Sequence, residues 1–109
     1  RNADYSTRTA ILKGKPMGHK NALERYLHID YCLFNKYLTL PEIVEYVNHK
    51  LVDNGLQSVS LRTIRKDIND IQTLFSIEVV KGHWFTDDKV HYRYDRNENA
   101  VFTQNWYDK

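Results

Sequence analysis

The sequence has a single cysteine, Cys32, so no disulfide can form within the chain and the fold needs no oxidising compartment. It also has no apolar run that approaches the roughly 18–20 residues of a membrane-spanning helix. The first residues lack the charged-then-apolar order of a secretion signal. Together these absences favour a soluble, globular protein of the cytoplasm.

The sequence also has little net charge. Its 16 lysine and arginine residues stand against 14 aspartate and glutamate residues, and the resulting charge of +2 is common among proteins that do not bind nucleic acid. Any argument for nucleic acid must therefore rest on where the charges lie. The 109 residues suit one domain with a single core. Because the chain opens with Arg1 rather than methionine, we expect it to be a piece of a longer protein.

Motifs for catalysis and metal binding are missing too. There is no G-x-S-x-G elbow, no P-loop and no glycine-rich phosphate cradle. The five histidines lack the spacing of a zinc site and have no second cysteine to join them. Asp87 and Asp88 are adjacent in a predicted loop, which offers no pocket for an acid and base pair. We therefore predict that the protein is not an enzyme and holds neither a metal nor a cofactor.

The spacing of apolar residues predicts two helices in the first half of the chain. In the first, over residues 20–35, apolar side chains recur every three or four positions, and Arg25 and Asp30 lie on the predicted solvent side. The second begins after Thr39, which can cap it, and Glu42 can close a capping box. It ends where an Asp-Asn-Gly sequence permits a positive φ.

A third helix follows the connecting loop. Ser60 is its natural N-cap, and apolar residues then repeat every three or four positions as far as Phe75. Beyond Phe75 the apolar period becomes two, which indicates a β-hairpin whose loop, residues 81–89, is long enough to project as a wing. The predicted fold is therefore a winged helix-turn-helix, mainly α with a β-hairpin wing in a two- or three-stranded sheet.

We divide the chain into three parts. Residues 1–18 form a basic arm, which is either flexible, or contacts the minor groove or phosphates of DNA, or docks on a partner through Ile11 and Leu12. Residues 19–96 hold the predicted winged helix-turn-helix. Residues 97–109 form a linker or a dimerisation tail, whose apolar side chains would pack against a second copy. Those side chains are Phe102, Trp106 and Tyr107.

The outer face of the third helix carries the main functional signal. On a helical wheel, an arc of about 100° gathers its basic and amide side chains, and Asp67 and Asp70 fall outside that arc. The arc holds Arg62, Arg65, Lys66 and Asn69. Arginine and lysine can reach guanine or phosphates, asparagine can pair with adenine, and Ser60 at the helix N-terminus can hold a phosphate. The alternative interpretation is an ordinary solvated helix face, and the exclusion of both aspartates favours DNA.

The sequence from Val59 to Ile68 resembles the recognition-helix signature V-S-x-R-T-I-x-x-D-I/L of DeoR-like and WYL-domain transcriptional regulators. The first helix and the Tyr92-Arg93-Tyr94 sequence also resemble these regulators, so the similarity covers roughly residues 20–102. The resemblance implies a bacterial transcriptional regulator that binds operator DNA through this domain. It also implies a ligand-sensing C-terminal WYL domain, which this sequence does not contain.

The resemblance also assigns individual positions. Asp67 belongs to the signature, but a carboxylate facing phosphate would oppose binding, so we expect it to pair with a basic residue of another helix. Leu61 departs from the signature, because many members have a polar or basic residue there, and we expect no base contact from it. The helix-start positions are those of Ser60, Arg62 and Thr63, and the variable contact positions are those of Arg65 and Lys66.

We therefore predict sequence-specific binding of double-stranded DNA, with the helix over residues 60–75 in the major groove. The predicted major-groove residues are Ser60, Arg62, Thr63, Arg65, Lys66 and Asn69. Phosphate or wing contacts are predicted for Thr39, Ser58, Lys81, His83, Lys89 and Arg93, although Asp87 and Asp88 oppose DNA contact by the wing.

A homodimer is expected in the full-length protein, because one recognition helix reads only a few base pairs. The protein would then be cytoplasmic, and associated with the nucleoid when bound to DNA. The alternative function is a winged-helix module for protein–protein interaction without DNA binding. Its surface would be formed by Trp84, Phe85, Trp106 and Tyr107.

Overall fold

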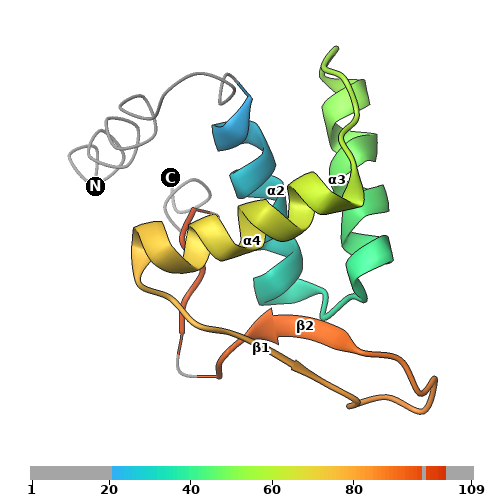
Figure 1. Cartoon of the computed structure of the whole chain (residues 1–109), viewed down its shortest axis with the longest axis vertical. Coiled ribbons are helices and arrows are strands. Elements are labelled where there is room, and N and C mark those ends of the chain that lie inside the picture. The colour runs from blue at the N-terminus through green and yellow to red at the C-terminus, as the bar shows by residue number, and fades with distance from the viewer. Residues whose placement is uncertain (1–20, 97, 103–109) are drawn as a thin grey trace.

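The computed structural model describes residues 21–96 and 98–102, which form three helices and one antiparallel hairpin (Figure 1). In chain order the elements are α2 (Ala22–Asn35), α3 (Leu40–Asp53), α4 (Leu61–Phe75), β1 (Val79–Gly82) and β2 (His91–Tyr94). This mainly helical fold with a hairpin is the one that the sequence predicts, and it is compatible with a winged helix. None of these helices is long and apolar enough to cross a membrane.

The helix ends follow the predicted capping chemistry. The Thr39 hydroxyl accepts a hydrogen bond from the Glu42 amide, and the Glu42 carboxylate accepts one from the Thr39 amide, so α3 begins with a complete capping box. After α3 the chain turns at Gly55, whose φ of +77° favours glycine. Helix α4 begins after Ser60, whose hydroxyl accepts from the Thr63 amide.

The core lies where the three helices meet. Helix α4 crosses α2 in Figure 1, α3 stands beside them, and the hairpin lies at one end of the bundle. Helix α2 packs against α3, α4 and β2, so it is the central element. The buried apolar side chains include Tyr26, Ile29 and Leu33 of α2, Ile43, Val47 and Leu51 of α3, and Ile64, Ile68 and Ile71 of α4.

The hairpin is joined to the helices by backbone pairing as well as by packing. The Tyr92 amide donates to the Leu38 carbonyl at 2.8 Å, and Thr39 forms an isolated antiparallel bridge with His91. The short segment before α3 therefore lies along the outer edge of β2 like a third strand. This pairing fixes the wing relative to the first turn of α3.

Two charged residues of α2 correct the sequence prediction. Arg25 and Asp30 were expected on the solvent side, but both side chains are buried. Arg25 pairs with Asp67 of α4, and Asp30 accepts hydrogen bonds from the Tyr94 hydroxyl and the Phe102 amide. Their burial is possible because the partners satisfy the charges, and periodicity of hydropathy cannot detect such partners.

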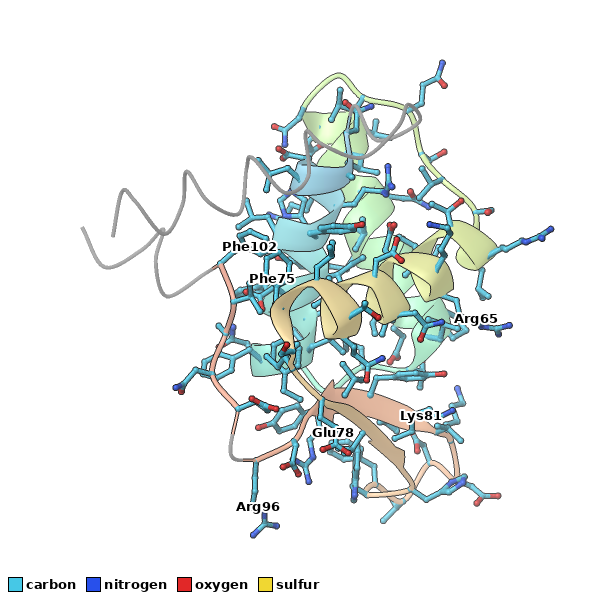
Figure 2. All side chains as sticks on the ribbon, turned by 60° about the vertical axis from the view of Figure 1, so that its left-hand side comes forward. Arg65, Phe75, Glu78, Lys81, Arg96 and Phe102 are labelled. Atoms are coloured by element: carbon cyan, nitrogen blue, oxygen red, sulfur yellow. The ribbon has the colours of Figure 1, made fainter. Side chains whose placement is uncertain are left out.

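The C-terminal segment is a second correction. Phe102 is fully buried and packs edge-on against Phe75, with ring centroids 5.3 Å apart, and Figure 2 shows the two rings adjacent. Phe102 is therefore a core residue and not part of an exposed dimerisation surface, and the folded domain extends beyond the predicted boundary at residue 96. The predicted arm, residues 1–18, and the tail residues Trp106 and Tyr107 lie outside the described residues.

Candidate nucleic-acid interface

The outer face of α4 presents the predicted polar arc. Arg62, Arg65, Lys66 and Asn69 are all exposed, whereas Ile64, Ile68 and Ile71 are buried against the other helices. This division follows from the amphipathic spacing of the helix, which leaves one side for the core and the other for solvent. Figure 2 shows Arg65 on the same side of the molecule as Lys81 of the hairpin.

The three cations of this face differ in their partners. Within residues 21–96 and 98–102, no carboxylate lies at ion-pair distance from Arg62 or Arg65. Lys66 is different, because its Nζ lies 3.0 Å from Asp70 Oδ2 one turn further along the helix. The two guanidinium groups are therefore available for a ligand, whereas Asp70 partly neutralises the charge of Lys66.

Both aspartates of α4 contact α2, although Asp70 also pairs with Lys66 of this face. Asp67 is 2% exposed, and the Arg25 guanidinium donates to both of its oxygens, at 2.6 and 3.1 Å. Burial raises the pKa of Asp67, and Arg25 offsets part of that rise by stabilising the carboxylate. Asp70 accepts a hydrogen bond from the Tyr26 hydroxyl at 3.2 Å. The expectation that Asp67 pairs with a basic residue of another helix is confirmed.

The first turn of α4 is fixed by side chains on both sides of it. The hydroxyl groups of Ser60 and Thr63 lie 3.2 Å apart, and Ser60 also caps the helix. Before the cap, Asn48 of α3 donates to the Val59 carbonyl at 2.9 Å and accepts from the Val59 amide at 2.7 Å. Sequence analysis missed Asn48, whose signal was a polar residue beside the apolar stripe of α3. Ser58 is exposed in the same connecting loop.

Two grooves flank α4 and share Arg65 and Tyr92. One, of about 550 Å³, lies between the start of α4, the start of α3 and β2. Its lining includes Leu61, Arg65, Pro41, Lys89, Val90 and Tyr92. The other, of about 410 Å³, lies between α4 and the hairpin and includes Asn69 and Lys81. The exposed surface therefore continues from α4 onto the hairpin.

Thr39 does not belong to this surface as a phosphate ligand, which corrects the sequence prediction. Its side chain is buried and its hydroxyl already accepts the Glu42 amide. The hydrogen bond from the Thr39 amide, more than any other contact, holds the pKa of Glu42 below its usual range. An anionic carboxylate thus occupies the N-terminus of α3, and it would oppose a phosphate there.

The predicted wing residues divide between the two faces of the hairpin. Lys81 pairs with Tyr92 in the register and lies on the groove that faces α4. Arg93 pairs with Val80, so it lies on the opposite face, where its guanidinium stacks 4.6 Å from the Trp84 ring. The structure therefore does not bring Arg93 together with the α4 face. His83 and Lys89 are exposed on the hairpin loop.

The acidic loop residues are partly used inside the wing. Asp87 accepts a hydrogen bond from the Lys89 amide at 3.0 Å and lies 2.8 Å from His91 Nε2. His91 Nδ1 lies 2.8 Å from the Tyr37 carbonyl, and the Phe85 ring packs against the imidazole with centroids 4.4 Å apart. Sequence analysis gave no sign of this buried contact of His91.

Both ring nitrogens of His91 therefore face acceptors. The Tyr37 carbonyl, followed by the Asp87 carboxylate, raises the pKa of His91. The Lys89 amide is the largest cause that lowers the pKa of Asp87, and His91 adds to it. The Lys89 amide and His91 partly compensate the negative charge of Asp87 within the hairpin, which weakens its repulsion of an anionic ligand.

No group of three or more histidine, cysteine or acidic side chains is placed to hold a metal ion in the part of the chain that the structure describes. Comparison of the chain with protein-family models, curated proteins and solved structures gives no match. The chemistry of the α4 face is therefore inferred from this chain alone.

Proposed function

We propose that the chain binds double-stranded DNA in a sequence-specific manner, with α4 in the major groove. The observation that carries the proposal is the pair of exposed arginines, Arg62 and Arg65, that have no carboxylate partner among the described residues. They project from a helix whose opposite face is fixed in the core, which presents them to a ligand in a defined orientation. The resemblance to DeoR-like and WYL-domain regulators supports a role as the DNA-binding module of a transcriptional regulator.

The residue types on α4 match the chemistry of the major groove. An arginine can donate two hydrogen bonds to O6 and N7 of guanine, and Asn69 can do the same with adenine. Lys66 would exchange Asp70 for a phosphate, which suits a contact that positions the protein without reading sequence. Ser60 and the first free amides of α4 would face a phosphate at the helix N-terminus.

The wing would add phosphate contacts through Lys81, His83 and Lys89, which are exposed. Arg93 and Thr39 are left out of this set, for the reasons of orientation and burial given above. A homodimer would place two copies of α4 about one helical turn apart on the duplex, so a selected binding site should be an inverted repeat.

Fluorescence anisotropy with pooled duplexes tests the proposal. Binding should weaken steeply as salt rises from low to physiological concentration, with a slope of about 0.9 for each phosphate contact. The double variant Arg62→Ala/Arg65→Ala should lose most of this binding. Lys36→Ala is the control, because Lys36 lies at the end of α2 beside Tyr31 and its substitution removes one positive charge outside the α4 face. Equal binding by both variants would contradict the proposal.

The alternative function, protein–protein interaction, would use the exposed aromatic residues of the wing. Trp84 and Phe85 are 41% and 48% exposed, but each already contacts a hairpin residue, Arg93 and His91 respectively. An aromatic interface should bind with little dependence on salt. If the chain binds no DNA at any salt concentration, the result would favour this alternative.

A further inference from the structure

We propose that Leu61 makes this surface select thymine, through contact between its side chain and the thymine C5-methyl group in the major groove. The proposal rests on the proposed DNA binding by α4 and names the base chemistry at one of its positions. Thymine is the one base of DNA that displays a methyl group in that groove.

Leu61 stands where base contacts are made in helix-turn-helix proteins. It is the first residue of α4, directly after the Ser60 cap, and the N-terminal residues of a recognition helix are the ones that reach base edges. Its side chain is 36% exposed although leucine is usually buried. The expectation from sequence that Leu61 adds no base contact assumed a polar contact, whereas a methyl group requires an apolar one.

The surroundings of Leu61 form an apolar wall inside a basic surface. Pro41, Val90 and Tyr92 line the same groove, and Val90 is 40% exposed. Arg65 follows Leu61 by one helical turn and lines that groove as well. An apolar wall beside an arginine that has no carboxylate partner among the described residues matches a ligand that carries both methyl groups and negative charge.

Charge decides between DNA and an apolar protein segment as the occupant. Arg65 and Lys89 both line the groove, and the carboxylate of Glu42 is held by the Thr39 amide. Lys89 and His91 also act on Glu42 and favour its charged form, so its charge is partly compensated. The cationic rim is therefore complementary to a polyanion, and thymine supplies the methyl group.

The test begins with sites enriched from random duplexes by the whole chain. Each enriched site is made once with thymine and once with deoxyuridine at every thymine position, which removes the methyl group alone. The wild-type chain should bind the deoxyuridine duplex about fourfold more weakly for each methyl group that Leu61 contacts, as expected for one buried methyl. Leu61→Ala should bind the two duplexes equally.

Two further variants separate contact from folding. Leu61→Met keeps an apolar side chain and should retain the difference between the thymine and deoxyuridine duplexes. Val52→Ala removes an exposed apolar side chain of α3 that lines neither groove, and it should leave the difference unchanged. Circular dichroism of all variants checks that the helices remain.

The outcomes distinguish the two proposals. If the wild-type chain enriches a site but binds its thymine and deoxyuridine forms equally, the Leu61 proposal is wrong and DNA binding stands. A difference that survives in Leu61→Ala would assign the methyl contact to another residue and would also overturn it. If no site is enriched and binding does not depend on salt, DNA binding fails, and the Leu61 proposal fails with it. If this groove binds an acidic protein segment in place of DNA, both proposals are likewise wrong.

Discussion

The outer face of α4 and the hairpin carry the same kinds of side chain, but they differ in what those side chains contact. On α4 the acidic residues are drawn inward by Arg25 and Tyr26, and two arginines stay without a carboxylate partner among the described residues. In the hairpin Asp87 accepts a hydrogen bond from the Lys89 amide of its own loop and contacts His91 of β2, and Arg93 stacks on Trp84. Whether a charged side chain is available to a ligand therefore depends on the residues that it contacts in the fold, and residue type alone does not show it.

The largest effect is expected from breaking the ion pair that holds the Asp67 carboxylate away from the α4 face. Arg25→Ala would leave Asp67 buried without its ion partner, which should lower the free energy of unfolding by about 3–5 kcal/mol. Urea denaturation measures this loss. The exposed Arg96 is a matched control, and Arg96→Ala should change stability by less than about 0.5 kcal/mol. A small effect of Arg25→Ala would mean that Asp67 can be rehydrated or neutralised at little cost.

The next effect concerns binding, and it compares α4 directly with the hairpin. Arg65→Ala should cost about 1–3 kcal/mol on an enriched DNA site and change the base preference, because the lost contact is to a base edge. Arg93→Ala removes the same side chain from the opposite hairpin face and should leave DNA affinity nearly unchanged. Titrations of both variants against enriched and random duplexes give the comparison. Equal losses for the two arginines would mean that Arg93 of the wing contributes as much to DNA binding as Arg65 of α4.

Lysines of the wing should behave differently from the α4 arginines. Lys81→Ala should weaken binding to all sequences alike and reduce the salt slope by about one, as expected for a phosphate contact. The measurement is the salt dependence of anisotropy on random duplexes. An altered base preference in this variant would place Lys81 among the base-reading residues.

A smaller effect on stability should come from the start of α4. Ser60→Ala removes the hydroxyl that accepts the Thr63 amide, and the loss of such a cap lowers the free energy of unfolding by about 1 kcal/mol. Ser60→Asp keeps an N-cap acceptor and should retain stability, but its negative charge should weaken DNA binding. Urea denaturation and anisotropy on the same samples separate the two roles.

The mildest effect is a pH dependence confined to the hairpin. The pKa of His91 is raised, so its stabilising contribution is complete below its ordinary value and is lost as pH rises through the raised value. The pKa of Asp87 is lowered, so its contribution is present above its ordinary value and is lost as pH falls through the lowered value. NMR titration of the histidine ring protons should show a pKa for His91 above the ordinary histidine value. Asp87→Asn should bring the pKa of His91 closer to its ordinary value, because it removes the carboxylate that helps to raise it.

Most of the secondary structure could be predicted from sequence because it depends on local interactions. Thr39 and Glu42 form the expected capping box, Ser60 caps α4, and the period of two after Phe75 marks the hairpin. These features depend on residues two to four positions apart, which the sequence displays directly. The site was predicted in part for the same reason, since the arc on α4 is a property of one helix.

Other parts of the site depend on residues far apart in sequence. Arg93 appeared to be a wing contact until the strand register set it on the far face with Trp84. Burial of Thr39 excludes it from the predicted phosphate contacts. The His91 ring lies at hydrogen-bond distance from the Tyr37 carbonyl, 54 positions away. A strand residue can face either side, and the register that decides this is set by pairing with another segment.

The sequence by itself determined the three helices, the N-caps of α3 and α4, and the basic arc of α4, because backbone hydrogen bonding and helical periodicity act over a few residues. Only the tertiary structure decided which charges of that arc remain available. Arg25 of α2, 42 positions away, pairs with Asp67 and buries it, whereas Asp70 bonds to Tyr26, 44 positions away, and still pairs with Lys66 of the arc. Asp30 accepts a hydrogen bond from the C-terminal segment, 72 positions away. The physical reason is that a buried charge must find its partner in space, and spatial neighbours exist only once the helices have packed.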